Sequence, residues 1–590
     1  MYTDLKPYQI IIGLLKKYGI KHCVLSAGSR NVPFVHSIEE DPFFQCYSVV
    51  DERSAGYFAL GLAQELNEPV VISCTSSTAT CNYWPPVAEA FYQGVPILVL
   101  TSDRDPAMLG QWEDQMIDQV GMYDRHVRKS VNLPLVNNRD DELFCQRLVN
   151  EALLELNHHG TGPVHINVPT KNYSNSFPCK NLMEVTKIER LCIDDAEHLW
   201  LEKIDKLKRM QRILVTCGQS SYVSTRLQKA VEEFFKHYNA AVSVEYMSNI
   251  ELEDALNTVV CMDSRYTISK KVKELLPDIV ISFGGQIFSS IKDQFRKFAG
   301  EFEHWLIQED GRVVDLYKSI NTVFECKPEY FFEFCVSHAE KGMRNNRAYY
   351  EQFRDYVNSV VIPEFPFSHV YAIKEVVEKI KPGSILHLSI NDSIRITNFF
   401  KLNPGIKVYA NIGTHGIDGC LSSFLGQAAA GNKPSYLVIG DLAFFYDMNA
   451  IRLRHIGRNV HILLINNDGG SEFYFNKMYQ NPASDLHTTA RHHTQAEGWV
   501  KSNKFIYLSA HDKESMKTAL ETFMRDDLDK PVFLEVFTEM KTDSDVIYDF
   551  FDLSRPKDVK SETLRKSKQF LKSTIGQENA LKIRDVLGLK

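Results

Sequence analysis

The sequence predicts an α/β protein with three doubly wound domains and mostly parallel sheets. Short apolar runs alternate with helix-length segments in three groups along the chain, and each group has enough elements for such a sheet. The first group contains HCVLSAGS, VVISCTSS, PILVLTSDR and PVHINVP, the second RILVTCG and DIVISFGG, and the third SILHLSI, KVYANIG, SYLVIGD, HILLINND and VFLEVFT. Pro363 and Pro366 interrupt both helix and strand, which indicates a linker before the third group.

These groups predict domains over residues 1–180, 190–355 and 367–553, followed by a basic C-terminal extension over 554–590. The first domain is expected to begin with an amphipathic helix and not a signal peptide, because MYTDLKPYQIIIGLLKKYGIKHC interleaves charges with apolar residues at helical spacing. The extension carries ten Lys or Arg against four Asp or Glu. This composition predicts an appended helix or a partly disordered segment.

Composition limits the class of protein. The 590 residues, 44% hydrophobic and 24% charged, are typical of a multidomain globular protein, and a net charge of -8 argues against a general nucleic-acid binder. No apolar run approaches the roughly 20 residues of a membrane helix. Twelve cysteines without a C-x-x-C pair are typical of free thiols, so we expect a cytoplasmic protein. Because no H-E-x-x-H is present, the pair His492-His493 is interpreted as surface or core residues and not as a metal site.

Two apolar runs of the third group end in polar residues. SYLVIGD ends at Asp441, and HILLINNDG ends with Asn467 and Gly469 one helix-length crossover later, as in a βαβ unit whose strand ends meet at one sheet edge. A carboxylate, an amide oxygen and a backbone carbonyl are ligands that Mg²⁺ accepts together with phosphate oxygens. The alternative is that Asp441 caps the next helix and the asparagines form a turn. Oxygen ligands at both strand ends favour the metal site.

This stretch resembles the diphosphate-binding motif of thiamine-diphosphate-dependent enzymes, Gly-Asp followed one crossover later by Asn-Asn. In that family the aspartate, the second asparagine and a nearby carbonyl hold the Mg²⁺ that bridges the diphosphate of the cofactor. The resemblance assigns these roles to Asp441, Asn467 and Gly469, and implies thiamine diphosphate and Mg²⁺ as cofactors. It also implies a pyrimidine-binding domain over 1–180, a central α/β domain over 190–355 and a diphosphate-binding domain over 367–553. Further cofactor-binding positions that it implies are Thr78, Gly416, Ile417, which would support the bent cofactor, and Leu442, where most members have Gly.

A second stretch, YSVVDERSAGYFALGLA, resembles the strand-to-helix turn that carries the catalytic glutamate of this family, which maps onto Glu52. Alone, an acid in the first turn of a helix is usually just favourable to the helix dipole. The diphosphate motif in the same chain favours the functional interpretation. In the family this glutamate comes from a neighbouring subunit, hydrogen-bonds the aminopyrimidine ring and promotes loss of the thiazolium C2 proton. The resemblance therefore implies a homodimer or homotetramer with shared active sites.

Five further motifs narrow the resemblance to one branch of the family. SAGSRNVP, TSDRDP, DQMIDQVGMY, NIGTHGIDGCLSS and GDLAFFYDMNA resemble the 2-succinyl-5-enolpyruvyl-6-hydroxy-3-cyclohexene-1-carboxylate synthases of menaquinone biosynthesis. Those enzymes decarboxylate 2-oxoglutarate and add the resulting acyl group to isochorismate. The substrate-binding positions that carry over are Ser29, Arg30, Arg104, Gln115 and Arg395. Several arginines suit substrates with several carboxylates, although each arginine alone would be interpreted as a surface or salt-bridge residue.

Several positions depart from the synthase pattern. Ile412 stands where the synthases have an arginine, and Ser290 and Ile291 stand where a basic pair is expected. Ser77 replaces a usual glycine. Glu472 replaces an aliphatic residue near the reactive end of the cofactor, where burial is expected to raise its pKa and make it a catalytic proton donor.

The leading expectation is a thiamine-diphosphate- and Mg²⁺-dependent 2-oxo acid decarboxylase and carboligase of the synthase type, acting on a 2-oxo acid donor and an anionic acceptor. The alternative is a simple decarboxylase in a surface-glycan or specialised-metabolite pathway, which the departures favour. Intact Glu52, Asp441 and Asn467 argue against a catalytically silent scaffold. No G-x-G-x-x-G opens a helix after a strand, which argues against a nicotinamide enzyme. Neither a nucleic-acid partner nor membrane insertion is expected.

Overall fold

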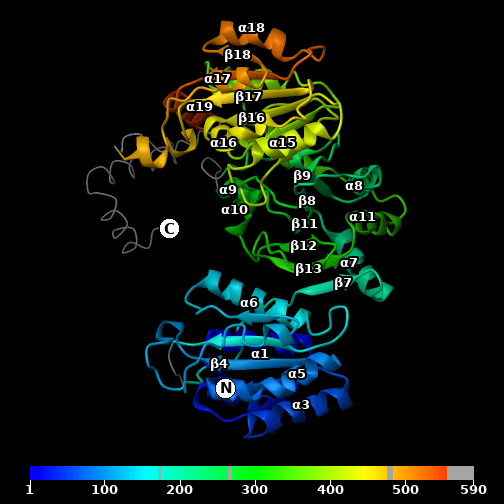
Figure 1. The fold of residues 1–590 in the computed structure, drawn as a ribbon. Coiled ribbons are helices and arrows are strands. Elements are labelled where there is room, and N and C mark those ends of the chain that lie inside the picture. The colour runs from blue at the N-terminus through cyan, green and yellow to red at the C-terminus, as the bar shows by residue number, and fades with distance from the viewer. Residues whose placement is uncertain (172–174, 264–268, 475–480, 482, 554–590) are drawn as a thin grey trace, which may run out of the picture. The chain divides into compact units, whose positions relative to one another are not determined.

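Three parallel β-sheets organise the chain, each combined with α-helices, as the sequence predicts (Figure 1). The computed structural model describes residues 1–171, 175–263, 269–474, 481 and 483–553. The predicted basic extension, 554–590, lies outside the described residues. Within the described part of the chain, no helix combines the length and apolarity needed to cross a membrane.

The first and third sheets have the same strand order. The first reads β2-β1-β3-β4-β6-β5 and the third β15-β14-β16-β17-β19-β18, so in both the order reverses between the first and third strands. Such a switch point leaves a crevice at the carboxyl ends of the strands, where ligands bind in open α/β sheets. The strands are β1 (His22–Leu25), β2 (Gln45–Ser48), β3 (Val70–Cys74), β4 (Ile97–Asp103), β5 (Ser130–Asn132), β6 (Val164–Pro169), β14 (Ile385–Leu388), β15 (Lys407–Ala410), β16 (Ser435–Gly440), β17 (Val460–Asn466), β18 (Ile506–Ala510) and β19 (Val532–Phe537).

The middle sheet has the order β10-β9-β8-β11-β12-β13-β7. Its strands are β7 (Glu189–Cys192), β8 (Ile213–Cys217), β9 (Ala240–Val244), β10 (Leu256–Asn257), β11 (Ile279–Phe283), β12 (Glu303–Ile307) and β13 (Ile320–Glu325). The chain packs as two compact units. Unit 1 comprises Met1–Ile213, Pro277–Phe283 and Phe298–Met343, and unit 2 comprises Leu214–Leu276, Gly284–Lys297 and the described residues from Arg344 onward. The domain boundaries expected from the sequence remain predictions.

Both faces of the third sheet are covered. Side chains alternate along a strand, so Tyr436 and Val438 of β16 pack in one apolar cluster and Leu437 and Ile439 in another. The first cluster includes α13 (His369–Val377), α18 (Lys513–Phe523) and α19 (Met540–Leu553). The second includes α15 (Cys420–Ala429), α16 (Asp441–Asp447) and α17 (Glu497–Ser502). Burial on both faces explains why the strands read as continuous apolar runs.

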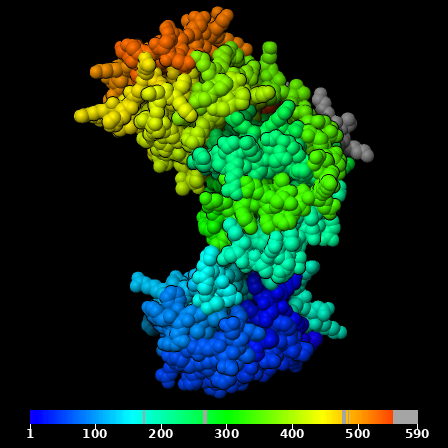
Figure 2. Space-filling model, turned by 90° about the vertical axis from the view of Figure 1, so that its right-hand side faces the viewer, coloured from blue at the N-terminus to red at the C-terminus, as the bar shows by residue number. Residues whose placement is uncertain are grey.

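The first sheet is built in the same way. Its faces are covered by α1 (Lys6–Tyr18), α2 (Val32–Glu39) and α6 (Arg139–Leu154) on one side and by α3 (Glu52–Leu66), α4 (Thr78–Asn82) and α5 (Trp84–Gln93) on the other. Figure 2 shows these N-terminal residues, in blue, as a closely packed body. The predicted N-terminal amphipathic helix is confirmed as α1, whose apolar residues are buried. The remaining helices are α7 (Glu197–Arg209), α8 (Thr225–His237), α9 (Ser269–Glu274), α10 (Ile291–Arg296), α11 (Pro328–Ser337), α12 (Ala348–Asn358) and α14 (Asp392–Thr397).

Candidate active site at two switch points

A pocket of about 250 Å³ opens at the switch point of the third sheet in unit 2. Residues 389–393 after β14, 440–443 after β16 and 469–473 after β17 line it, as the rule for open α/β sheets predicts. Among the residues singled out from the sequence, the lining includes Ile417, Asp441, Leu442, Asn467, Gly469 and Glu472. Gly416 directly precedes this lining in the chain.

Asp441 links the ends of the two central strands. The parallel register pairs Gly440 with Ile465, which brings the residues after β16 and β17 together. The Oδ2 atom of the buried Asp441 accepts hydrogen bonds from the backbone N–H groups of Asn467 and Gly469, each at 3.0 Å. The N-cap of α16 is Gly440, without a side-chain cap. Asp441 is therefore the first residue of the helix and not its N-cap. Its Oδ1 accepts from the Leu442 N–H at 2.6 Å, so the carboxylate binds both the start of the helix and the opposite loop.

Asn467 and Gly469 complete a set of oxygen donors. The Nδ2 of Asn467 donates to Asp543 at 2.9 Å, and no described residue donates a hydrogen bond to its Oδ1. Gly469 has φ 145°, and a Cβ there would lie 2.7 Å from the Thr489 carbonyl oxygen. The Gly469 carbonyl accepts from the Ser471 N–H at 3.1 Å and keeps a second lone pair. A carboxylate, an amide oxygen and a carbonyl fit a Mg²⁺ ion that also binds phosphate oxygens.

His492, which no sequence motif marks as a site residue, also lies at this carboxylate. Its Nε2 is 3.4 Å from Oδ2 of Asp441. The hydrogen bond to Asp441 raises the pKa of His492, and the nearby Asp468 acts in the same direction. The signal of His492 in the sequence was weak because the residue comes from a polar loop with no motif around it.

A chain of buried charges runs beside the pocket. Nδ1 of His369 lies 3.1 Å from Asp543, and its Nε2 lies 3.6 Å from Asp392. Burial would lower the pKa of His369, but the two carboxylates outweigh burial and raise it to about 10. Asp392 in turn accepts from Arg395 at 2.6 Å. These contacts connect Asn467, through Asp543, to Arg395.

Arg395 lies among carboxylates. Its Nη2 is 3.2 Å from Oε1 of Glu472, and its Nε is 3.8 Å from Asp263. Burial opposes the charge of the guanidinium, but Asp392, Glu472 and Asp263 outweigh burial and raise the pKa of Arg395. The structure thus gives Glu472 a guanidinium partner that the sequence did not indicate.

The predicted substrate positions of unit 1 lie on loops after strands of the first sheet. Ser29 and Arg30 form a short 3-10 turn after β1, and the Arg30 N–H lies 3.4 Å from Oγ1 of Thr75 at the end of β3. Burial and the neighbouring Arg104 lower the pKa of Arg30. The Gln115 carbonyl accepts from Ser76 at 3.0 Å. Ser29 and Arg30 after β1 and Thr78 after β3 flank the switch point of this sheet.

The two remaining cofactor positions of unit 1 begin helices. Glu52 is the first residue of α3, whose N-cap Asp51 accepts from the Ser54 N–H at 2.9 Å. Thr78 is the first residue of α4, after Ser77. Ser77 has φ 74°, a conformation that favours glycine, and its N–H donates to Gln119 at 2.8 Å. This φ angle explains why glycine is usual at this position, although this chain has serine.

Two departures from the synthase pattern have a structural context. Ile412 is fully buried in the core cluster that contains β14 and β15, so its side chain does not line the pocket. Ile291 is also buried, but the next residue, Lys292, donates to the Ile287 carbonyl at 2.5 Å, and burial lowers its pKa. Lys292 supplies positive charge one position beyond the expected basic pair, and this role was not predicted from the sequence.

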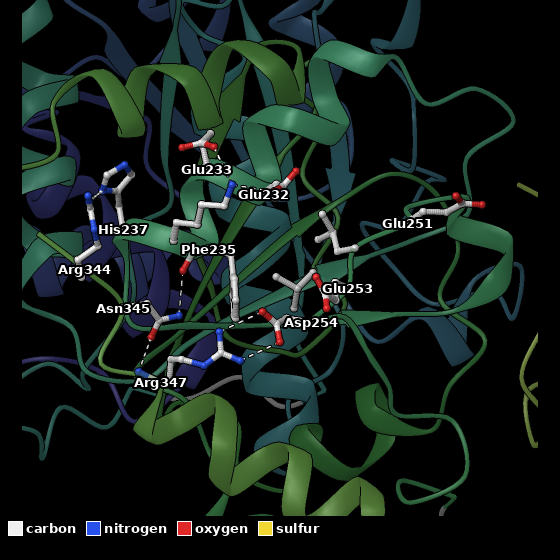
Figure 3. A pocket seen from close by; sticks show the side chains of 13 residues that line it. Glu232, Glu233, Phe235, His237, Glu251, Glu253, Asp254, Arg344, Asn345 and Arg347 are labelled. Carbon is white, nitrogen blue, oxygen red and sulfur yellow. Dashed lines mark hydrogen bonds and ion pairs between the residues drawn. The ribbon is translucent and has the colours of Figure 1, made fainter. Parts of the chain in front are cut away.

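A larger cavity of about 580 Å³ lies elsewhere in unit 2 (Figure 3). It contains none of the positions predicted from the sequence, and several of its charged groups pair with one another. Arg347 pairs with Asp254 at 2.7 Å, and Lys236 pairs with Glu232 at 2.7 Å and Glu233 at 2.9 Å. The smaller pocket at the switch point is therefore the candidate active site of this unit.

Comparison with known proteins agrees with this geometry. Residues 6–122 match the family model described as thiamine pyrophosphate enzyme, N-terminal TPP binding domain. A Bacteroides fragilis protein named 2-succinyl-5-enolpyruvyl-6-hydroxy-3-cyclohexene-1-carboxylate synthase is 36% identical over 564 residues, covering 93% of this chain and 99% of that protein. Proteins of the same name from Bacteroides thetaiotaomicron (36% over 561 residues) and Flavobacterium johnsoniae (30% over 563 residues) have the same coverage. The chain therefore belongs to the 2-succinyl-5-enolpyruvyl-6-hydroxy-3-cyclohexene-1-carboxylate synthase family of thiamine-pyrophosphate enzymes.

Proposed function

We propose that the chain catalyses the synthase reaction of its relatives in the cytoplasm, decarboxylating 2-oxoglutarate and transferring the acyl group to isochorismate, with thiamine diphosphate and Mg²⁺ as cofactors. The observation that carries this proposal is the convergence of the Asp441 carboxylate, Asn467 and Gly469 at the switch-point pocket. The named relatives support it because they align with 93% of the chain. The twelve free cysteines support a reducing compartment.

The residues of the chain have distinct roles in this proposal. Asp441, Asn467 and the Gly469 carbonyl hold Mg²⁺ and thereby the diphosphate, while Ile417 and Leu442 give the pocket its apolar wall. Thiamine diphosphate, when bound, supplies the carbanion chemistry that decarboxylation of a 2-oxo acid requires. Glu52 would hydrogen-bond the aminopyrimidine ring of the bound cofactor and exchange a proton with it. Thr78 and Gly416 would also bind the cofactor.

Substrate recognition is assigned to cations at the two switch points. The carboxylates of the donor and the acceptor bind to Arg30 and Arg104, with Ser29 and Gln115, in unit 1 and to Arg395 in unit 2. Lys292, which is half-buried and lies near His415, adds positive charge in unit 2. The donor and the acceptor have two carboxylates each, which matches the four cations named above.

The proposal includes at least a homodimer with shared sites. Apolar side chains are exposed around Glu52: Val50 is 77% exposed, and Tyr57 and Phe58 on α3 are 44% and 45% exposed. Exposed apolar patches of this kind mark interaction surfaces. A second copy of the chain that covers this patch would place Glu52 in a shared site. Sedimentation of the active protein as a monomer would contradict this part of the proposal.

A simple decarboxylase is the second candidate function, and Glu472 separates it from the first. Glu472 lines the pocket, as a proton donor to the decarboxylated donor would. Its contact with Arg395 at 3.2 Å favours a carboxylate that orients the guanidinium. Under the synthase proposal, Glu472 therefore acts on the position of Arg395 and not on the substrate proton.

The test compares the products of Glu472→Gln and the unmodified protein with 2-oxoglutarate, with and without isochorismate. We expect the variant to form the adduct at a rate within about tenfold of the unmodified protein, because the amide oxygen still accepts from Arg395. A proton donor would instead contribute about 10²- to 10⁴-fold to aldehyde release. Loss of aldehyde release of that size, with no adduct formed by either protein, would support the second function. Glu497→Gln, at a half-exposed position on α17 that pairs with Lys501 outside the pocket, is the matched control.

A further inference from the structure

Outside the candidate active site, three side chains of unit 1 converge on the carboxylate of a fourth. The buried Glu325 at the end of β13 has its Oε2 2.9 Å from Nε2 of His158 and 3.2 Å from Sγ of Cys192, and its Oε1 2.5 Å from Nε2 of His159. The parallel register of β13 and β7 places Glu325 directly beside Cys192. The two histidines come from the segment after α6, distant in the sequence from both strands. Three separate segments therefore supply two imidazoles, a thiol and a carboxylate.

The two nitrogens of His158 face carboxylate oxygens. Nε2 faces Glu325, and Nδ1 lies 3.1 Å from Glu155, which also accepts from Arg190 at 2.9 Å. A neutral imidazole has one N–H donor, so it can satisfy only one of the two oxygens. Either a proton or a metal ion at Nε2 removes the conflict, because Nδ1–H then donates to Glu155. The order carboxylate, histidine, metal is the usual outer arrangement around a histidine-bound metal ion.

The local backbone is shaped to bring these groups together. His159 has φ 50°, in the left-handed region, while its ring lies 4.2 Å from that of His158. Arg128 donates to the carbonyls of Glu155 and His158 and so holds the segment. Gly311 has φ 64°, and a Cβ there would lie 2.5 Å from Oε2 of Glu325. A side chain at position 311 would therefore crowd the carboxylate.

The charge around the point is negative. Glu325 is 7% exposed, and Asp194 and Asp195 follow Cys192 closely in the chain. Cysteine, histidine and carboxylate are the ligand types of zinc sites, with distances of about 2.3 Å for sulfur and 2.0–2.2 Å for nitrogen and oxygen. Ligand atoms of His158, His159 and Glu325 lie within 4.8 Å of one another. The Cys192 thiol, 3.2 Å from the Glu325 carboxylate, lies beside this group and completes a tetrahedral set when its side chain turns toward the ion.

We propose that His158, His159, Cys192 and Glu325 form a structural Zn²⁺ site that fastens the segment after α6 to strands β7 and β13. Binding replaces the thiol proton, which leaves to solvent, with the metal. The protein fills all four coordination positions of the ion. The site therefore stabilises the fold and leaves no open position for substrate. It is independent of the proposed synthase reaction.

The first test measures Zn²⁺ binding to the full-length chain in excess Mg²⁺ and thiamine diphosphate, which occupy the other metal site. After chelator treatment, we expect one equivalent of Zn²⁺ to bind in competition with a chromogenic chelator. His159→Ala should weaken binding by at least about 100-fold, because loss of a ligand should exceed the 10- to 100-fold effect of an outer partner. His159 is 68% exposed, so this substitution leaves the packing in place. The exposed His198 on α7 gives the matched control, His198→Ala.

The second test follows the thiol. Zn²⁺ should protect Cys192 from alkylation, read by peptide mass spectrometry, while the half-buried Cys46 stays unprotected. Co²⁺ in place of Zn²⁺ should give a thiolate charge-transfer band that Cys192→Ser abolishes and Cys46→Ser retains. Absence of stoichiometric Zn²⁺ binding, or equal binding by His159→Ala and the unmodified chain, would overturn the proposal. Loss of thermal stability in the variants without any stabilisation of the unmodified chain by Zn²⁺ would show a hydrogen-bonded cluster only and would also overturn it.

Discussion

Glu52→Gln is expected to lower turnover by about 10³-fold while leaving thiamine diphosphate bound. Glutamine keeps the size and the hydrogen-bonding carbonyl of the side chain but cannot exchange a proton with the aminopyrimidine ring, and general acid–base groups contribute about 10²- to 10⁴-fold. Glu52 is the first residue of α3, and its N-cap hydrogen bond is made by Asp51, so the helix start does not depend on the substituted carboxylate. Steady-state CO2 release and cofactor titration measure the two quantities separately.

The matched control is Glu65→Gln, the same substitution at an exposed position near the end of the same helix. It should retain full turnover. Undiminished turnover in Glu52→Gln would show that Glu52 takes no part in the reaction. Loss of cofactor binding in that variant would instead assign Glu52 a role in retention.

Asp441→Ala is expected to weaken thiamine diphosphate binding in Mg²⁺ by at least about 100-fold, since loss of a ligand should exceed the effect of losing an outer partner. The substitution also removes the acceptor of the Asn467 and Gly469 N–H groups, and each buried donor left unpaired costs about 1–3 kcal/mol. We therefore expect a lower free energy of unfolding as well. Calorimetric titration and denaturant unfolding report the two effects.

Asp441→Asn separates charge from hydrogen bonding. Its amide oxygen can still accept from the backbone, so the fold should be nearly as stable as the unmodified chain, while affinity for the Mg²⁺ complex of the cofactor still falls. Asp447→Ala, at the other end of α16, is the matched control and should bind the cofactor normally. Unchanged cofactor affinity in both Asp441 variants would be incompatible with the proposed metal site.

The central strands of the first and third sheets could be predicted from the sequence because burial on both faces makes them continuous apolar runs. The edge strand β15 was also predicted, as KVYANIG, but the edge strands β2 and β18 could not be. β2 (Gln45–Ser48) and β18 (Ile506–Ala510) are largely half-exposed, and their residues mix polar and apolar types. In the middle sheet, β12 begins with Glu303 and β13 ends with Glu325, charged residues whose partners become visible only in the structure. The α-helix in the crossover between β16 and β17 is also shorter than the helix-length segment expected, because α16 ends at Asp447 and a 3-10 turn follows it.

The part of the candidate site that consecutive strands bring together could be predicted from the sequence. Asp441 and Asn467 follow consecutive, adjacent strands, so their proximity follows from the βαβ pattern. His369 and Asp543 come from helices far apart in the sequence, and nothing local indicates that they meet. Asp543 stands in the polar sequence KTDSD, which does not mark it as a buried residue. The ion pair of Glu472 with Arg395 likewise depends on tertiary packing.

The most direct measurement of the central claim is the mass of the product that the purified chain forms from 2-oxoglutarate and isochorismate with thiamine diphosphate and Mg²⁺. The synthase proposal predicts CO2 release matched by an adduct of isochorismate and the decarboxylated donor, and neither without the cofactor. CO2 release without this adduct, or release only from other 2-oxo acids, would contradict the synthase proposal and leave the second function.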